Sequence, residues 1–155
     1  MKARTFLISL AIAAASTSLT AAPLDSARDA VVSEVEPTAL ATQSIAIGSV
    51  PAQVEIADTP AAWRQGLTGR THLGEDAGML FLFPTSHTQS FWMKDVPIPL
   101  DVAFLDDEKR IFQIELMSPN TRTLHVSKKP CRYVLEMPGG WFARRGIRPG
   151  TPVAF

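Results

Sequence analysis

The sequence is poor in cysteine, since Cys131 is the only one among 155 residues. A single cysteine cannot form a disulfide within the chain, so the fold must rest on a buried hydrophobic core. Arg132 beside it would favour the thiolate of a nucleophile, but neither His nor Asn is close by in the sequence. We therefore interpret Cys131 as a small buried residue at the start of a strand.

Neither sign of charge is in excess, because 15 Lys and Arg residues match 15 Asp and Glu residues. This balance gives no support for nucleic acid as a partner. Basic residues nevertheless gather in one part of the chain, between positions 122 and 148. This group consists of Arg122, Lys128, Lys129, Arg132, Arg144, Arg145 and Arg148. It is typical of a solvated face and also fits a surface that docks an anionic ligand or a protein.

Several motifs of known chemistry are missing from the sequence. It has no Gly-x-Ser-x-Gly elbow, no dinucleotide-binding fingerprint and no P-loop. The three histidines, His72, His87 and His125, lack the close spacing of a metal motif such as H-E-x-x-H. We therefore predict no cofactor and no metal, and the sequence leaves open whether the protein is an enzyme.

Long apolar runs are confined to the N-terminus. Lys2 and Arg4 precede an apolar stretch over residues 6–15, and small residues follow as far as position 22. This pattern is typical of a secretory signal peptide, and the stretch is too short for a permanent transmembrane helix. We predict a signal peptide over residues 1–22 and an exported protein, periplasmic or extracellular, whose mature form has no transmembrane segment.

The mature chain divides into a linker and one folded domain. Residues 23–43 mix Asp, Ser, Glu, Pro and Thr without a clear period, which predicts a flexible linker. Removing Lys2 and Arg4 from the 15 basic residues leaves 13 against 15 acidic ones, so the mature protein is slightly acidic. The folded domain is predicted over residues 44–155.

Within this domain, short apolar or alternating runs are separated by turns. A good helix start is formed by Asp58, Thr59 and Pro60. A turn at residues 138–140 precedes a second short helix, which is predicted at residues 141–145. The predicted strands lie at residues 45–47, 53–56, 78–83, 90–94, 98–105, 110–117, 132–137 and 151–155, with a hairpin at 98–117. We predict a mainly β (α+β) fold, a small antiparallel sheet or partly closed β-barrel-like domain with two short helices.

Five motifs in a fixed order carry a family resemblance. They lie at residues 63–70, 78–81, 91–94, 98–101 and 133–140. With them the chain resembles the domain-of-unknown-function family 192 (DUF192) of bacteria and archaea, whose members are often exported. The resemblance covers about residues 53–155, implies a small β-rich, barrel-like domain, and implies no activity. Cys131 stands where the family is expected to have another small residue.

Polar and aromatic residues in the apolar strands are the candidate site. Trp92 and Lys94 are two apart in a predicted strand and would share a face, with Asp101 on the next strand. A sugar or other polar ring would stack on the indole and accept or donate hydrogen bonds there. The alternative is structural, with Trp92 in the core and an ion pair between Lys94 and Asp101.

Arg70 and Glu136 complete the candidate ligand-binding set. The guanidinium of Arg70 suits an anionic group, or it would pair structurally with Asp101 or Glu136. Glu136 lies in an otherwise apolar strand, where a carboxylate needs a partner. Asp101 and Glu136 together also fit the acid/base pair of a hydrolase.

We therefore predict a non-catalytic binding or accessory module of the cell envelope. Its ligand would be a small polar or anionic molecule or an envelope component. A hydrolase that uses Asp101 and Glu136, and a protein-interaction domain that uses the basic face, are the alternatives.

Overall fold

The computed structural model describes residues 39–155. The predicted signal peptide and most of the predicted linker lie outside these residues. The first strand, β1, begins at Thr42, just before the predicted domain boundary at residue 44. No helix among the described residues is long and apolar enough to span a bilayer.

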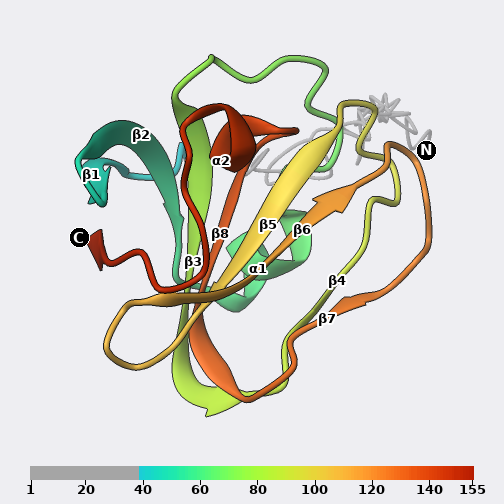
Figure 1. The fold of residues 1–155 in the computed structure, drawn as a ribbon. Coiled ribbons are helices and arrows are strands. Elements are labelled where there is room, and N and C mark those ends of the chain that lie inside the picture. The colour runs from blue at the N-terminus through green and yellow to red at the C-terminus, as the bar shows by residue number, and fades with distance from the viewer. Residues whose placement is uncertain (1–38) are drawn as a thin grey trace, which may run out of the picture. The chain divides into compact units, whose positions relative to one another are not determined.

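Seven strands form one strongly curled sheet, in the order β6-β5-β8-β3-β2-β1-β9 (Figure 1). Their bounds are Thr42–Ile47 (β1), Val50–Ala57 (β2), Ala77–His87 (β3), Leu100–Leu105 (β5), Ile111–Met117 (β6), Cys131–Pro138 (β8) and Val153–Ala154 (β9). Two short strands, Ser90–Phe91 (β4) and His125–Val126 (β7), pair separately. The helices are Pro60–Gln65 (α1) and Trp141–Arg144 (α2).

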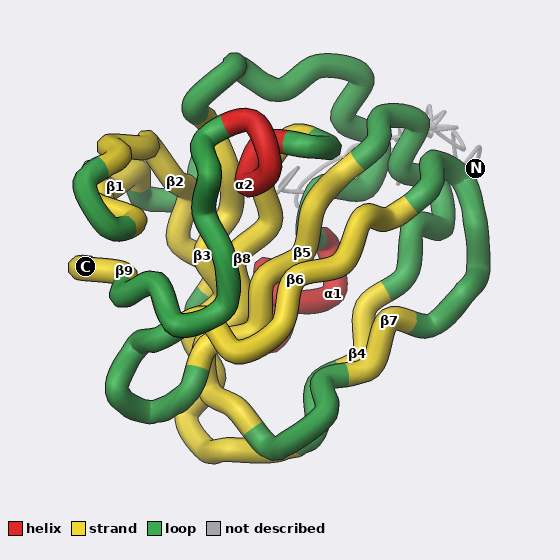
Figure 2. The backbone as a smooth tube through the Cα atoms, in the orientation of Figure 1, coloured by secondary structure: helices red, strands yellow, loops and turns green. Residues whose placement is uncertain are grey.

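The predicted fold class is confirmed. Strands dominate, both helices are a few residues long, and the remaining segments are loops (Figure 2). All pairings are antiparallel except that of β2 with β3, where α1 and a long loop provide the crossover that a parallel pair requires. The predicted hairpin is the β5–β6 pair.

The C-terminal segment brings the two ends of the curled sheet towards each other. Arg110, just before β6, forms a bridge with Pro152, while β9 pairs with β1 at the opposite end of the strand order. The sheet is therefore a partly closed barrel, as the sequence predicts.

One predicted strand is wrong in its length. Residues 90–94 were expected to be extended, but only Ser90 and Phe91 are paired, and the chain turns at Asp95, whose φ is 58°. Asp95 and Val96 therefore do not continue the strand. As a result, the alternation argument that put Trp92 and Lys94 on one face does not apply.

Helix α1 is fixed by the local sequence that predicts it. The Thr59 hydroxyl accepts a hydrogen bond from the Ala62 N–H at 3.2 Å, and Pro60 occupies the first turn. Gly66 ends the helix with a φ of 46°. The Trp63 indole N–H donates to the Ala57 carbonyl at 2.9 Å, which fixes the ring relative to β2.

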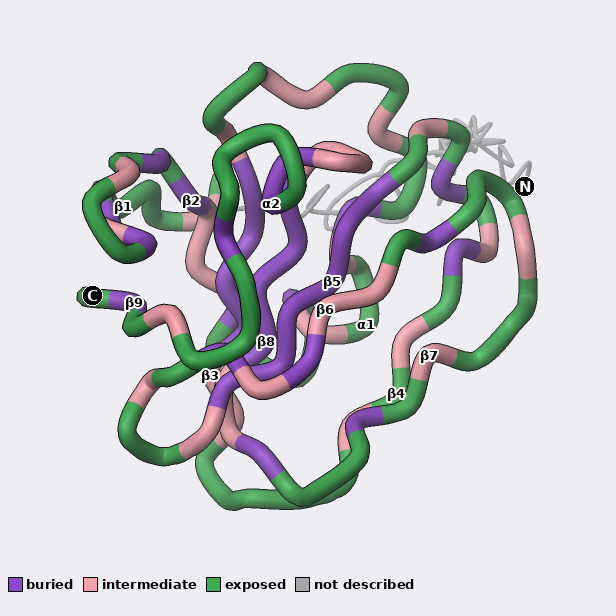
Figure 3. Tube along the Cα trace, in the orientation of Figure 1, coloured by how far each residue is buried: buried purple, intermediate pink, exposed green. Residues whose placement is uncertain are grey.

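Buried residues are concentrated in β3, β5 and β8 (Figure 3). They belong to two separate hydrophobic cores, one on each face of the sheet. The first core includes Ala103, Leu135, Met137, Trp141 and Phe142, and we call it the α2 core. The second includes Ala62, Met79, Phe81, Val102 and Val134, and we call it the α1 core. Neighbouring residues of β5 and β8 thus alternate between the two cores, as strand geometry requires.

Candidate functional site

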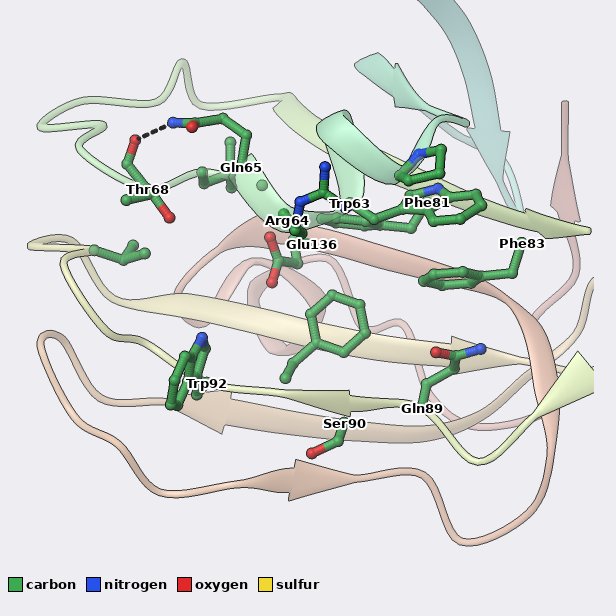
Figure 4. Close-up of a pocket in the computed structure, with 15 residues that line it drawn as sticks. Trp63, Arg64, Gln65, Thr68, Phe81, Phe83, Gln89, Ser90, Trp92 and Glu136 are labelled. Atoms are coloured by element: carbon green, nitrogen blue, oxygen red, sulfur yellow. Dashed lines mark hydrogen bonds between the residues drawn. The ribbon is translucent and has the colours of Figure 1, made fainter.

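The candidate site is a pocket on the α1 side of the sheet, between α1 and β4 (Figure 4). We call it the α1–β4 pocket, and its volume is about 420 Å³. Fifteen residues line it. They are Pro60, Trp63, Arg64, Gln65, Gly66, Leu67, Thr68, Phe81, Phe83, Gln89, Ser90, Phe91, Trp92, Val96 and Glu136.

Aromatic rings form much of the pocket wall. The rings of Trp63 and Phe83 have centroids 5.1 Å apart, and Phe91 meets Phe81 edge-on at 5.0 Å. Trp92 is half exposed, and in Figure 4 it lies opposite Trp63 and Phe81. These ring contacts hold the wall in place before any ligand arrives.

Glu136 lies at the bottom of the pocket and is only 4% exposed. Its neighbours across the strands are Met79 of β3 and Val102 of β5, both apolar. Gly78 lets β3 come this close, because a Cβ there would lie 2.4 Å from the Glu136 carbonyl oxygen. Apolar residues thus flank Glu136 on both neighbouring strands, and its side chain lines the pocket.

The Glu136 carboxyl has no hydrogen-bond or ionic partner among the described residues, and burial alone raises its pKa to about 8. Its oxygens are not sealed off, since the group lines the pocket. Burial therefore favours the neutral, protonated form of this carboxyl in the unliganded protein. A buried acid with a raised pKa that faces a pocket is a candidate functional residue.

Asp101 lies on the other face of the sheet. The register of β5 against β8 places Val102 opposite Glu136 and Asp101 opposite Met137, so the two carboxyl groups point to different cores. The Asp101 oxygens accept hydrogen bonds from the backbone N–H groups of Gly140 at 2.9 Å and Phe142 at 3.2 Å. Asp101 thus caps α2, and the predicted acid/base pair of Asp101 and Glu136 is not formed.

Arg70 and Lys94 lie outside the pocket. Arg70 pairs with Glu55 of β2 at 2.6 Å, so the expected structural partner, Asp101 or Glu136, is wrong. Lys94 is half exposed and lies 3.6 Å from Asp95, its neighbour in the turn, so the expected Lys94–Asp101 pair is also absent. Of the five predicted ligand-binding residues, the structure brings Trp92 and Glu136 together at the pocket.

Sequence reasoning did not assign the α1 and β3 side of the pocket. The sequence predicts a helix that starts at residues 58–60 and a strand at residues 78–83, but it assigns no role to Trp63, Phe81 or Phe83. Phe81 and Phe83 are two apart on β3 and therefore share the face that meets α1. That spacing, together with a tryptophan on the adjacent helix, was the signal available in the sequence.

Arg64 is the other charged residue of the pocket lining, and it is exposed. Figure 4 shows it extending from α1 on the same side of the pocket as Glu136. No ion pair joins the two side chains within the described residues. The pocket therefore combines aromatic rings, one buried acid, one exposed cation and four uncharged polar residues, namely Gln65, Thr68, Gln89 and Ser90.

The basic residues between positions 122 and 148 do not act as one free group. Arg145 pairs with Glu75 at 3.1 Å and Asp76 at 2.6 Å, and Lys129 lies 3.8 Å from Asp106. Arg132 donates to the Phe83 carbonyl. Local acids and carbonyls thus already engage part of the predicted basic face. Cys131 is buried at the first position of β8, as predicted, and burial raises the pKa of its thiol.

Comparison with known proteins agrees with the motifs. The model of the DUF192 family, described as "Uncharacterized ACR", matches residues 41–155. The chain belongs to the DUF192 family. No curated protein shows significant similarity to it.

Two solved structures are similar to this DUF192 chain. One is a protein of unknown function from Novosphingobium aromaticivorans DSM 12444, with a TM-score of 0.73 and 33% identity over 77% of this chain and 89% of that one. The other, from Sinorhizobium meliloti 1021, is described as a putative transcription regulator. It has a TM-score of 0.71 and 31% identity over 74% of this chain and 94% of that one. The molecular function of the family is uncharacterised.

Proposed function

We propose that this protein is a non-catalytic binding module of the cell envelope and that it holds a small ligand in the α1–β4 pocket. One observation carries the proposal: the Glu136 carboxyl is 4% exposed, lacks a partner in the described residues, and opens into an aromatic pocket. Burying such a group costs free energy that folding alone does not recover. A ligand that satisfies the carboxyl would recover it.

The pocket has the general properties of a small-molecule site. It is concave, it combines five aromatic residues with six polar or charged ones, and its volume of about 420 Å³ falls in the range of ligand sites. Binding is favoured over hydrolysis because the second predicted carboxylate, Asp101, is bound to backbone N–H groups on the opposite face. The name of the relative described as a transcription regulator does not extend to this chain, whose charge is balanced.

Export is part of the proposal and rests on the N-terminal sequence. Lys2, Arg4 and the apolar stretch over residues 6–15 support a signal peptide. Expression of the full chain in a Gram-negative host, followed by fractionation and N-terminal sequencing, tests it. We expect a periplasmic product cleaved near residue 22, and recovery of the uncleaved chain in the cytoplasm would contradict export.

Ligand mapping by NMR tests the pocket. The purified protein is titrated with a panel of small neutral, cationic and anionic aromatic compounds, and amide shifts are mapped onto the structure. Ser90 is exposed and lines the pocket, so Ser90→Trp fills the entrance, whereas Ser118→Trp is the same change in an exposed loop. We expect pocket shifts in the wild type and in Ser118→Trp, and their loss in Ser90→Trp. Equal shifts in both variants, or none with any compound, would refute the site.

A further inference from the structure

We infer that the ligand of the α1–β4 pocket is an organic cation with N–H donors, an ammonium or amidinium-type group on an apolar body. This inference rests on the proposed binding function and names its ligand class. It follows from the juxtaposition of one partnerless buried carboxyl with several aromatic faces in a single pocket.

The carboxyl determines the polar part of the ligand. An ionised carboxylate is only an acceptor of hydrogen bonds, and no described residue donates to Glu136. A ligand that displaces water from the pocket then has to supply these donors itself. A group with several N–H donors and a positive charge satisfies both oxygens and the charge together, and such charge-assisted bonds are about twice as strong as neutral ones.

The walls determine the rest of the ligand. Trp63, Phe81 and Trp92 line the same pocket as the carboxyl (Figure 4). Aromatic faces attract cations through their quadrupoles, most strongly when the cation is removed from water. The same rings remove an apolar body from water. An anion would meet the acid at the bottom of the pocket and gain nothing from the aromatic faces.

The charges that face Glu136 are few, which makes its protonation a clean reporter. Among residues 39–155, Arg64 on α1 is the only other charged residue of the lining. The neighbouring strands β3, β4 and β5 present uncharged residues, namely Met79, Phe81, Ser90, Phe91 and Val102. Binding a cation ionises Glu136 and releases a proton to solvent. Affinity for the cation should therefore rise by up to about tenfold per pH unit below the pKa of the free carboxyl.

Calorimetry with five matched probes tests the inference. Benzamidine and benzylamine are cations with N–H donors, benzyltrimethylammonium is a cation without them, benzyl alcohol is neutral and benzoate is an anion. We expect the two N–H cations to bind at least about tenfold more tightly than benzyl alcohol and benzyltrimethylammonium at pH 7, with no binding of benzoate. In two buffers of different ionisation enthalpy, benzamidine binding should release close to one proton.

Two matched carboxyl-to-amide variants complete the test. In Glu136→Gln, benzamidine and benzyl alcohol should bind with about equal affinity, and benzamidine binding should release no proton. Glu115 lies outside the pocket and pairs with His125, so Glu115→Gln should retain both. Circular dichroism checks that each variant is folded, and the proton count on the wild type needs no variant at all.

The outcomes separate the inference from the function on which it rests. If no probe of any charge binds, the binding function fails with it. If benzyl alcohol or benzoate binds as tightly as benzamidine, or if no proton is released, the pocket is a site but the cation inference is wrong. Equal affinity for benzyltrimethylammonium and benzamidine would overturn the requirement for N–H donors.

Discussion

Asp101 and Glu136 lie on adjacent strands, and each is 4% exposed, yet they occupy opposite environments. Asp101 accepts two backbone hydrogen bonds and holds the start of α2 in place. Glu136 faces a pocket and has no partner among the described residues. Burial alone therefore does not distinguish a structural carboxyl from a candidate functional one. The two differ in whether N–H groups of the protein donate hydrogen bonds to them.

The largest expected difference between the two acids is in the pH dependence of stability. Glu136 ionises near pH 4.5 when unfolded and near 8 when folded. The unfolded state therefore binds fewer protons between these values, and stability falls as pH rises, by about 1.4 kcal/mol per pH unit. We expect Glu136→Gln to remove this slope and to be more stable than the wild type at pH 8. Urea unfolding from pH 4.5 to 8.5 measures both.

Glu115→Gln is the control for that experiment. Burial opposes ionisation of Glu115, but hydrogen bonds from His125 and Gln113 outweigh it and lower the pKa of this carboxyl. Its contribution to stability is thus lost on acidification, the opposite sign from that of Glu136. If Glu136→Gln leaves the alkaline slope unchanged, then Glu136 is not a buried neutral acid and the contrast with Asp101 is lost.

The second expected difference is the cost of truncating the capping carboxyl. Asp101→Ala leaves the N–H groups of Gly140 and Phe142 without their acceptor, which should cost about 2–4 kcal/mol of unfolding free energy at pH 7. Asp101→Asn keeps one acceptor oxygen and should cost less. Chemical denaturation gives the values, and benzamidine affinity of the folded fraction should be unchanged. If Asp101→Ala instead weakens benzamidine binding and leaves the unfolding free energy unchanged, then Asp101 serves the ligand and does not stabilise α2.

The sequence predicted the fold better than the site, for a physical reason. Helix α1 and the β5–β6 hairpin follow from local signals, namely Thr59, Pro60 and the turn at residues 106–109. The site depends on register. A shift of one residue between β5 and β8 would have put Asp101 and Glu136 on the same face, and alternation in one strand does not fix its pairing with another.

Single residues show the same limit. Glu136 was singled out because a carboxyl in an apolar strand is costly, and that argument is independent of register. Arg70 and Lys94 were singled out because of their neighbours in sequence, but Arg70 pairs with Glu55 on a distant strand and Lys94 lies beside a turn at Asp95. Signal peptide, linker and export stay predictions, because residues 1–38 lie outside the described part of the chain.

The smallest expected effect compares two arginines close in sequence, the exposed Arg64 and the partly buried Arg70. Arg64 lines the pocket, whereas Arg70 pairs with Glu55 outside it. Removing the positive charge at the pocket should strengthen benzamidine binding in Arg64→Gln by about two- to threefold at low salt, and less in 0.15 M salt, where exposed charges are screened. Arg70→Gln should leave affinity unchanged and cost at most about 1 kcal/mol of stability, the usual range for an exposed ion pair. Calorimetry at two salt concentrations makes the comparison.

If Arg64→Gln instead weakens benzamidine binding, then the guanidinium contacts the ligand, and the polar contacts of the pocket are not confined to Glu136.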